Sequence, residues 1–162
     1  MSEVSEKIDF PSLGRLEGVT VSPKNRPVVC IQGLGFVGSV MAVAVAMAKH
    51  KDEEPFFNVV GIDLPNRQGN SRVNSLNSGK FPIKNKDKSL SDCFEKVHAQ
   101  GNLLATTDKK CFSLADIVLV DINLDLEVPS QGDHTVSWIN FRNAIADLGK
   151  FLKPGALVII ET

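Results

Sequence analysis

The sequence predicts an α/β domain with a doubly wound, mainly parallel sheet and helices on both of its faces. Short apolar stretches rich in β-branched residues alternate with stretches of helical spacing, which is typical of a parallel sheet with right-handed crossovers. The first such stretch, Val28 to Ile31, leads into a glycine-rich turn and then an apolar helix. The 162 residues fit one domain with a substantial core. We place it at residues 27–162, after an irregular N-terminal arm at residues 1–26 whose prolines and glycines show no sustained period.

The turn after the first strand carries three glycines at the spacing G-x-G-x-x-G. In a dinucleotide site the first glycine makes a tight bend, the second lets the backbone approach a pyrophosphate, and the third lets helix and strand pack closely. The helix that follows presents free N–H groups and its positive dipole end to the phosphates. These features predict a Rossmann-like dinucleotide site. Its predicted cofactor-binding residues are Gly33, Leu34, Gly35, Phe36, Val37 and Gly38.

A second β-rich stretch, from Asn58, ends in the acid Asp63. An acid at this point accepts hydrogen bonds from the adenosine ribose hydroxyls. It also repels the extra phosphate of NADP, so we expect NAD to be the preferred cofactor. The alternatives for Asp63 are a solvated acid at a strand end and a helix N-cap.

The remaining elements follow from hydrophobic periodicity and from turn residues. We expect a helix from about 36 to 49, a loop at 64–71, a helix opened by Arg72 and stopped by Gly79 and Pro82, a helix at 90–100, a strand within 101–108, a short helix at 109–112, a strand at 117–120, a polar loop at 125–133, a helix at 135–151 and a last strand at 156–160.

The strand ends in such a sheet meet at one edge, where ligands bind. We therefore expect one crevice to contain the glycine turn, Asp63, residues 106–108, residues 121–125 and Glu161. These tips contain neither a Ser/His/Asp nor a Cys/His set, and no metal cluster is predicted.

Composition argues against several other classes of function. The 18 basic and 19 acidic residues are well mixed and give a net charge of -1, so no footprint for nucleic acid or an anionic membrane is predicted. The longest apolar stretch, Phe36 to Ala48, is too short to span a bilayer, and the acidic N-terminus does not resemble a secretory signal. Cys30, Cys93 and Cys111 show no paired or metal-ligand spacing. We expect a cytoplasmic protein.

Several stretches in order then fit one family: G-L-G-F-V-G, the acid Asp63, R-V-N-S-L-N-S-G-K-F-P-I, L-L-A-T-T-D, A-D-I-V-L-V and L-K-P-G-A-L-V-I-I-E-T. Together they resemble the N-terminal NAD-binding domain of the UDP-glucose/GDP-mannose 6-dehydrogenases, over roughly Val28 to Thr162. The resemblance implies an enzyme that oxidises the C6 alcohol of a nucleotide sugar to a uronic acid in two hydride transfers to NAD.

The resemblance also implies roles for residues beyond the glycine turn. Arg72 matches the arginine on the adenosine side, with Arg67 as a rival because the preceding loop is longer. Thr107 lies in the turn near the cofactor. Asn123 preserves part of a turn that contacts cofactor or substrate, although the stretch D-I-N-L-D-L lacks the usual threonine. Glu161 matches a catalytic glutamate that positions water and polarises the reacting centre.

The family's nucleophilic cysteine, its catalytic lysine and its central and C-terminal substrate domains would lie beyond residue 162. We therefore expect this chain to bind NAD without turnover, the nucleotide sugar to bind through the absent domains, and the full-length protein to form a homodimer or a larger assembly. Two alternatives are a β-hydroxyacid dehydrogenase cofactor domain, which uses the same glycine turn, and a non-catalytic dinucleotide-sensing module.

Overall fold

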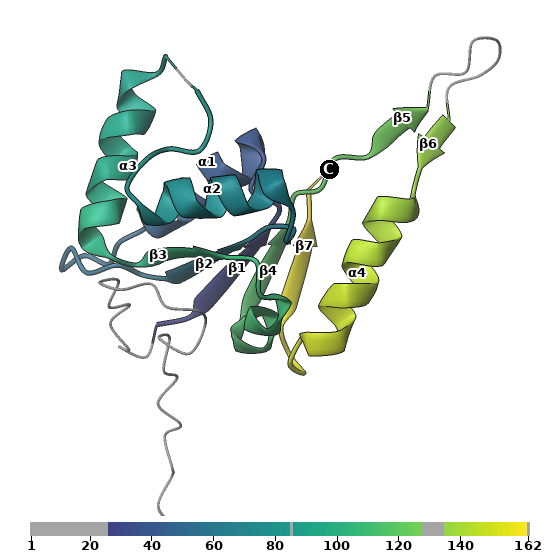
Figure 1. The fold of residues 1–162 in the computed structure, drawn as a ribbon. Coiled ribbons are helices and arrows are strands. Elements are labelled where there is room, and N and C mark those ends of the chain that lie inside the picture. Colours follow the sequence, from purple (N-terminus) through teal and green to yellow (C-terminus); the bar gives the residue numbers. More distant parts are fainter. Residues whose placement is uncertain (1–25, 85, 128–134, 162) are drawn as a thin grey trace, which may run out of the picture.

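The computed structural model describes residues 26–84, 86–127 and 135–161 (Figure 1). Five parallel strands form the main sheet in the order β3-β2-β1-β4-β7. They are β1 (Val28–Gln32), β2 (Asn58–Ile62), β3 (Leu103–Thr106), β4 (Ile117–Val120) and β7 (Leu157–Ile160). This confirms the predicted doubly wound sheet, whose strand order reverses between β1 and β4. The predicted N-terminal arm lies almost entirely outside the described residues.

Helices cover both faces of this sheet (Figure 1). They are α1 (Phe36–Ala46), α2 (Arg67–Asn77), α3 (Lys88–Gln100), the 3₁₀ helix η2 (Lys109–Leu114) and α4 (Ile139–Phe151). One hydrophobic cluster joins the sheet to α1, α2 and α3, and a second joins it to η2 and α4. Within the described ranges, no helix is long and apolar enough to cross a bilayer.

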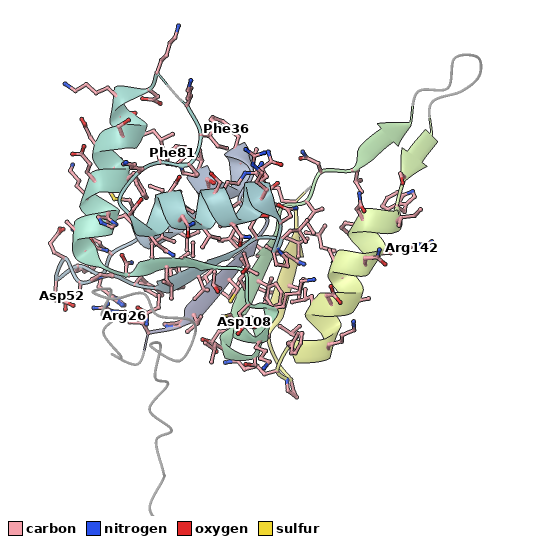
Figure 2. All side chains as sticks on the ribbon, in the orientation of Figure 1. Arg26, Phe36, Asp52, Phe81, Asp108 and Arg142 are labelled. Atoms are coloured by element: carbon pink, nitrogen blue, oxygen red, sulfur yellow. The ribbon has the colours of Figure 1, made fainter. Side chains whose placement is uncertain are left out.

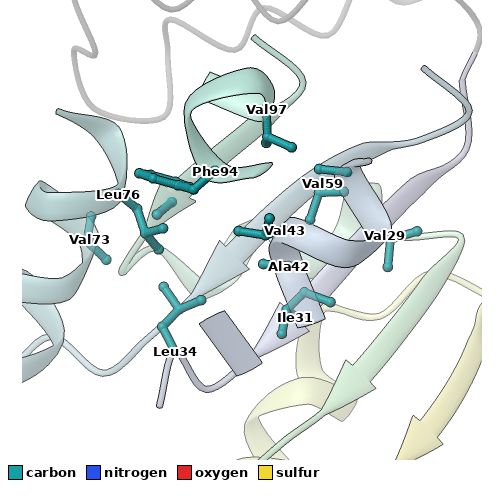
Figure 3. Packing of buried hydrophobic residues seen from close by; sticks show 12 residues of the cluster. Val29, Ile31, Leu34, Ala42, Val43, Val59, Val73, Leu76, Phe94 and Val97 are labelled. Atoms are coloured by element: carbon teal, nitrogen blue, oxygen red, sulfur yellow. The ribbon is translucent and has the colours of Figure 1, made fainter. Parts of the chain in front are cut away.

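The two central strands, β1 and β2, are buried along their whole length, as continuous apolar runs in a parallel sheet require. Figure 3 shows α1 and α3 packed over them through residues such as Val43, Val59 and Val97. The alanines Ala42 and Ala46 of α1 are fully buried. Their small side chains let the helix lie close to the sheet, as its composition predicts.

The predicted start of α2 is wrong. The helix begins at Arg67 instead of Arg72, because the side chain of Asn66 accepts a hydrogen bond from the Gly69 backbone N–H at 2.8 Å and acts as an N-cap. Gly69 permits this tight start, since a Cβ there would lie 2.0 Å from the Leu64 carbonyl oxygen. The residues that predict a loop, proline, asparagine and glycine, instead build the helix start.

The predicted loop at 125–133 and the helix start at Thr135 are also wrong in part. The segments β5 (Asp125–Glu127) and β6 (Thr135–Ser137) pair as a separate two-stranded antiparallel sheet, and α4 begins only at Ile139. Residues 128–134 lie outside the described part. The pairing joins two short segments that are separated by seven residues, and helical spacing alone does not reveal it.

Two of the three cysteines belong to the core. Cys30 on β1 and Cys111 on η2 are fully buried, and the Cys30 thiol lies 3.6 Å from the Cys111 carbonyl oxygen. Burial raises the pKa of the Cys111 thiol to about 12, and it raises the pKa of Cys30 further. Neither thiol has the electropositive, accessible surroundings of a nucleophile.

The outer edge of β3 is covered by an asparagine of α2. The Asn77 side-chain amide donates to the Ala105 carbonyl oxygen and its oxygen accepts from the Ala105 N–H, both at 2.8 Å. One side chain thus takes the place of a neighbouring strand and fixes α2 against the sheet edge.

Replacing Asn77 with alanine should lower the free energy of unfolding by about 1–3 kcal/mol, because it leaves two backbone groups of β3 without partners. Urea unfolding followed by circular dichroism measures the change. Asn74→Ala, at an exposed position on the same helix, is the matched control and should have little effect. Equal stability of the two variants would show that the Asn77 hydrogen bonds contribute nothing.

Candidate dinucleotide-binding site

Hydrogen bonds join the carboxyl ends of all five parallel strands in one line. Backbone N–H groups just beyond the strands donate to the neighbouring strand ends: Asp63 to Thr106, Gly33 to Ile62, Asp121 to Gln32 and Glu161 to Val120, at 2.8–3.1 Å. The structure therefore brings the predicted strand tips to one edge of the sheet, and the glycine turn lies at the centre of that edge.

Two glycines of the turn are required by the fold itself. Gly33 has φ +97°, and a Cβ there would lie 2.0 Å from the Asp121 carbonyl oxygen. A Cβ at Gly38 would lie 2.0 Å from the Gly33 carbonyl oxygen. The first glycine lets the chain reverse beside β4, and the third lets α1 close over the turn.

The middle glycine is different. A Cβ at Gly35 would meet nothing within 4 Å, and its φ of -62° is open to any residue. Gly35 is the N-cap of α1 without a side-chain hydrogen bond, and the first turn carries no acid. Phe36, labelled in Figure 2, is 55% exposed, and Val37 is 48% exposed. The N-terminus of α1 therefore faces open space, and the orphan N–H groups of its first turn suit an anion.

Leu34 fixes the glycine turn to the hydrophobic core. Its side chain is fully buried and lies against Gly61 of β2, where a Cβ would approach the Leu34 Cδ2 atom to 2.7 Å. The absence of a side chain at Gly61 thus makes room for Leu34. Of the predicted cofactor residues, Leu34 serves packing, and it holds its neighbours Gly33 and Gly35 at the sheet edge.

Asp63 lies at the end of β2 and is 9% exposed. One carboxylate oxygen accepts from the Leu64 N–H at 2.8 Å, and the other accepts from the Arg72 guanidinium at 3.2 Å. Asp63 is thus neither a solvated acid nor the N-cap of α2, which is Asn66. Arg72 reaches the predicted ribose acid from the body of α2, whereas its rival Arg67 is exposed at the first helical position.

The other predicted residues lie along the same edge. Thr107 follows β3 beside Asp108, which caps η2 by accepting from the Lys110 N–H at 2.9 Å. Asn123 is exposed after β4, and Glu161 is exposed after β7. The structure places them on the edge that carries the glycine turn, and their roles toward a ligand stay predictions.

The contact between Asp121 and the glycine turn could not be found from the sequence. Its carboxylate accepts a hydrogen bond from the Gly38 N–H, within the first turn of α1. Burial raises the pKa of this carboxyl, the Gly38 hydrogen bond opposes that change, and Glu161 raises the pKa again, with a net shift upward. The sequence places Asp121 at a strand tip, but no spacing signal links it to the glycine turn. In the part of the chain that the structure describes, no group of three or more metal-binding side chains occurs.

Comparison with known proteins gives a consistent result. The model of the UDP-glucose/GDP-mannose dehydrogenase family, NAD binding domain, matches residues 27–162. UDP-N-acetyl-D-mannosamine dehydrogenase of Yersinia pestis is 28% identical over 134 residues, which are 83% of this chain and 27% of that protein.

Solved structures show the same fold. NDP-N-acetyl-D-galactosaminuronic acid dehydrogenase of Methanosarcina mazei Go1 superposes with a TM-score of 0.72 at 27% identity, over 84% of this chain and 27% of that one. GDP-mannose dehydrogenase of Pseudomonas aeruginosa superposes with a TM-score of 0.61 at 21% identity, over 82% and 27%, and supports the fold alone. The chain thus spans about a quarter of the length of these proteins.

The family match decides between the two enzyme families that share the glycine turn. This chain belongs to the UDP-glucose/GDP-mannose dehydrogenase family and contains its NAD-binding domain.

Proposed function

We propose that this chain binds NAD across the glycine turn and Asp63, as the cofactor-binding part of an enzyme that oxidises the C6 alcohol of a UDP- or GDP-sugar to a uronic acid. The observation that carries the proposal is the contrast among the three glycines. At Gly33 and Gly38 the backbone leaves no room for a side chain, whereas at Gly35, the N-cap of α1, there is free space around the position of a Cβ. This is the space that a pyrophosphate needs.

The residues present fit the two ends of the adenosine diphosphate moiety. The first-turn N–H groups of α1 suit the pyrophosphate. Each oxygen of Asp63 accepts one hydrogen bond within the protein, and a carboxylate oxygen has two lone pairs. Asp63 therefore keeps acceptor capacity for ribose hydroxyls, while Arg72 holds its orientation. Bound NAD would supply the hydride acceptor.

The acid also accounts for the proposed preference for NAD. An NADP phosphate on the ribose would meet the Asp63 carboxylate at short range, in a site where Asp63 is nearly buried. Arg72 offsets part of this repulsion but is already engaged by Asp63. We infer that NAD binds more tightly than NADP.

The oxidation itself is proposed for the complete enzyme. Glu161 lies at the end of β7 on the same edge as the glycine turn, where a carboxylate can hold a water molecule near the reacting carbon. Since the chain spans about a quarter of its relatives' length, we assign recognition of the nucleotide sugar, and assembly into a homodimer or larger oligomer, to the complete enzyme. Alone, this chain should bind the cofactor without turnover.

Replacing Gly35 with valine tests the pyrophosphate site. The fold accommodates the side chain, because no atom lies within 4 Å of the new Cβ, so stability should change little. NAD binding, measured by calorimetric titration, should be lost because valine occupies the phosphate space. Gly149→Val on α4, where a Cβ also meets nothing within 4 Å, is the matched control and should bind NAD normally. If Gly35→Val bound NAD as the control does, the pyrophosphate would lie elsewhere.

Asp63→Asn tests the ribose contact. Loss of a charge-assisted hydrogen-bond set should cost about 1.5–3 kcal/mol of NAD affinity, which is a decrease of roughly tenfold to a hundredfold. The ratio of NAD to NADP affinity should fall as well, because Arg72 is freed to meet the extra phosphate. Titrations with both dinucleotides measure the ratio, and Asp92→Asn, at an exposed position on α3, should leave it unchanged. An unaltered ratio in Asp63→Asn would exclude the ribose contact.

A further inference from the structure

Asp121 contacts the glycine turn with both its backbone and its side chain. Its N–H donates to the Gln32 carbonyl oxygen at 2.9 Å, and its own carbonyl oxygen lies where a Cβ on Gly33 would fall. The carboxylate accepts the Gly38 N–H, and a Cβ on Gly38 would lie 2.8 Å from the Asp121 Oδ2 atom. The side chain is therefore held against the first turn of α1.

This carboxylate supplies the cap that α1 lacks. The N-cap position is Gly35, which has no side chain to accept an orphan N–H, and the first turn contains no acid. The Asp121 side chain, at the end of β4, is the acceptor for the N–H of Gly38, the third residue of the helix. The N–H groups of Phe36 and Val37 stay without intrahelical partners. The N-terminus of α1 therefore has the Asp121 carboxylate close to the free space at Gly35 that a phosphate would occupy.

The surroundings of Asp121 favour its neutral form. Burial raises the pKa of Asp121, the Gly38 N–H opposes this change, and Glu161, at the end of the neighbouring β7, raises the pKa again. β1 ends in the neutral Gln32, and the glycine turn with the first turn of α1 has no ionisable side chain. On α4, which shares the core cluster of β4, Arg142 is exposed and Asp147 pairs with Lys109 and Lys150.

We propose that Asp121 competes with the pyrophosphate for the N-terminus of α1, so that dinucleotide binding is coupled to proton uptake by Asp121 and the ionised form of this residue lowers cofactor affinity. The inference rests on the proposed NAD site. Two negative charges from the pyrophosphate, added beside Asp121, disfavour its ionised form. Its pKa is therefore higher in the complex than in the free chain. By linkage, affinity is greatest below the pKa of the free chain, falls as pH rises through the interval between the two pKa values, and is constant above it.

The test is a calorimetric titration of the whole 162-residue chain with NAD between about pH 5 and pH 8, where the phosphates stay ionised. The wild-type Kd should increase several-fold across this range, with an upper limit of about tenfold per pH unit for one proton. Titrations in two buffers of different ionisation enthalpy should show net proton uptake. Asp121→Asn keeps the acceptor for Gly38 and removes the charge, so it should bind NAD more tightly at pH 8, without the wild-type pH dependence or proton uptake.

Asp116→Asn is the matched control. Asp116 precedes β4, where it accepts from the Val28 N–H and pairs with Lys153, both at 2.7 Å. The same change of charge there, at the opposite end of the strand, should leave the wild-type pH dependence intact.

The outcomes separate the two proposals. NAD binding by the wild-type chain with a constant Kd and no proton uptake would overturn the role of Asp121 and leave the NAD site standing. Weaker binding by Asp121→Asn than by the wild-type chain at pH 8 would also overturn it, since Asp121 would then act only as a structural cap. Absence of NAD binding by both chains at every pH would overturn the NAD site and the inference together.

Discussion

The candidate site depends on the backbone hydrogen bonds that continue the sheet one residue past four of its strands. Through them the residues after β2, β1, β4 and β7 are held at one edge, each bonded to the last residue of the neighbouring strand. The position of Gly33 between Ile62 and Asp121 follows from this line of bonds, and so does the direction in which α1 starts. Without the parallel register, the glycine turn would be a flexible loop with no fixed relation to Asp63.

Two carboxylates of this edge, Asp63 and Asp121, lie in different electrostatic settings. Asp63 is paired with the guanidinium of Arg72. Asp121 has a hydrogen bond from the backbone and a second carboxylate, Glu161, as its charged neighbour. A helix N-terminus stabilises an anion, so Asp121 and the pyrophosphate of the proposed cofactor would compete for the same favourable potential. In our account the cofactor affinity of this chain reflects that balance as well as the glycine spacing.

Much of this arrangement could be predicted from sequence because its signals are local. The strand, the glycine turn and the small residues of α1 are contiguous, and each has a direct steric reason to occur in that order. The start of α2 was missed, since the side chain of Asn66 completes a cap that proline and glycine nearby conceal. The pairing of β5 with β6 and the contact of Asp121 with Gly38 each join two separate segments, and no periodicity within a single segment reports such a contact.

The most direct measurement is the two-dimensional ¹H–¹⁵N NMR spectrum of the isotope-labelled chain during titration with NAD. If the first turn of α1 holds the pyrophosphate, the amide signals of Gly35, Phe36 and Val37 should show the largest shifts, together with signals near Asp63. Saturable shifts confined to other segments, or a spectrum that NAD leaves unchanged, would contradict the placement of the cofactor at this turn.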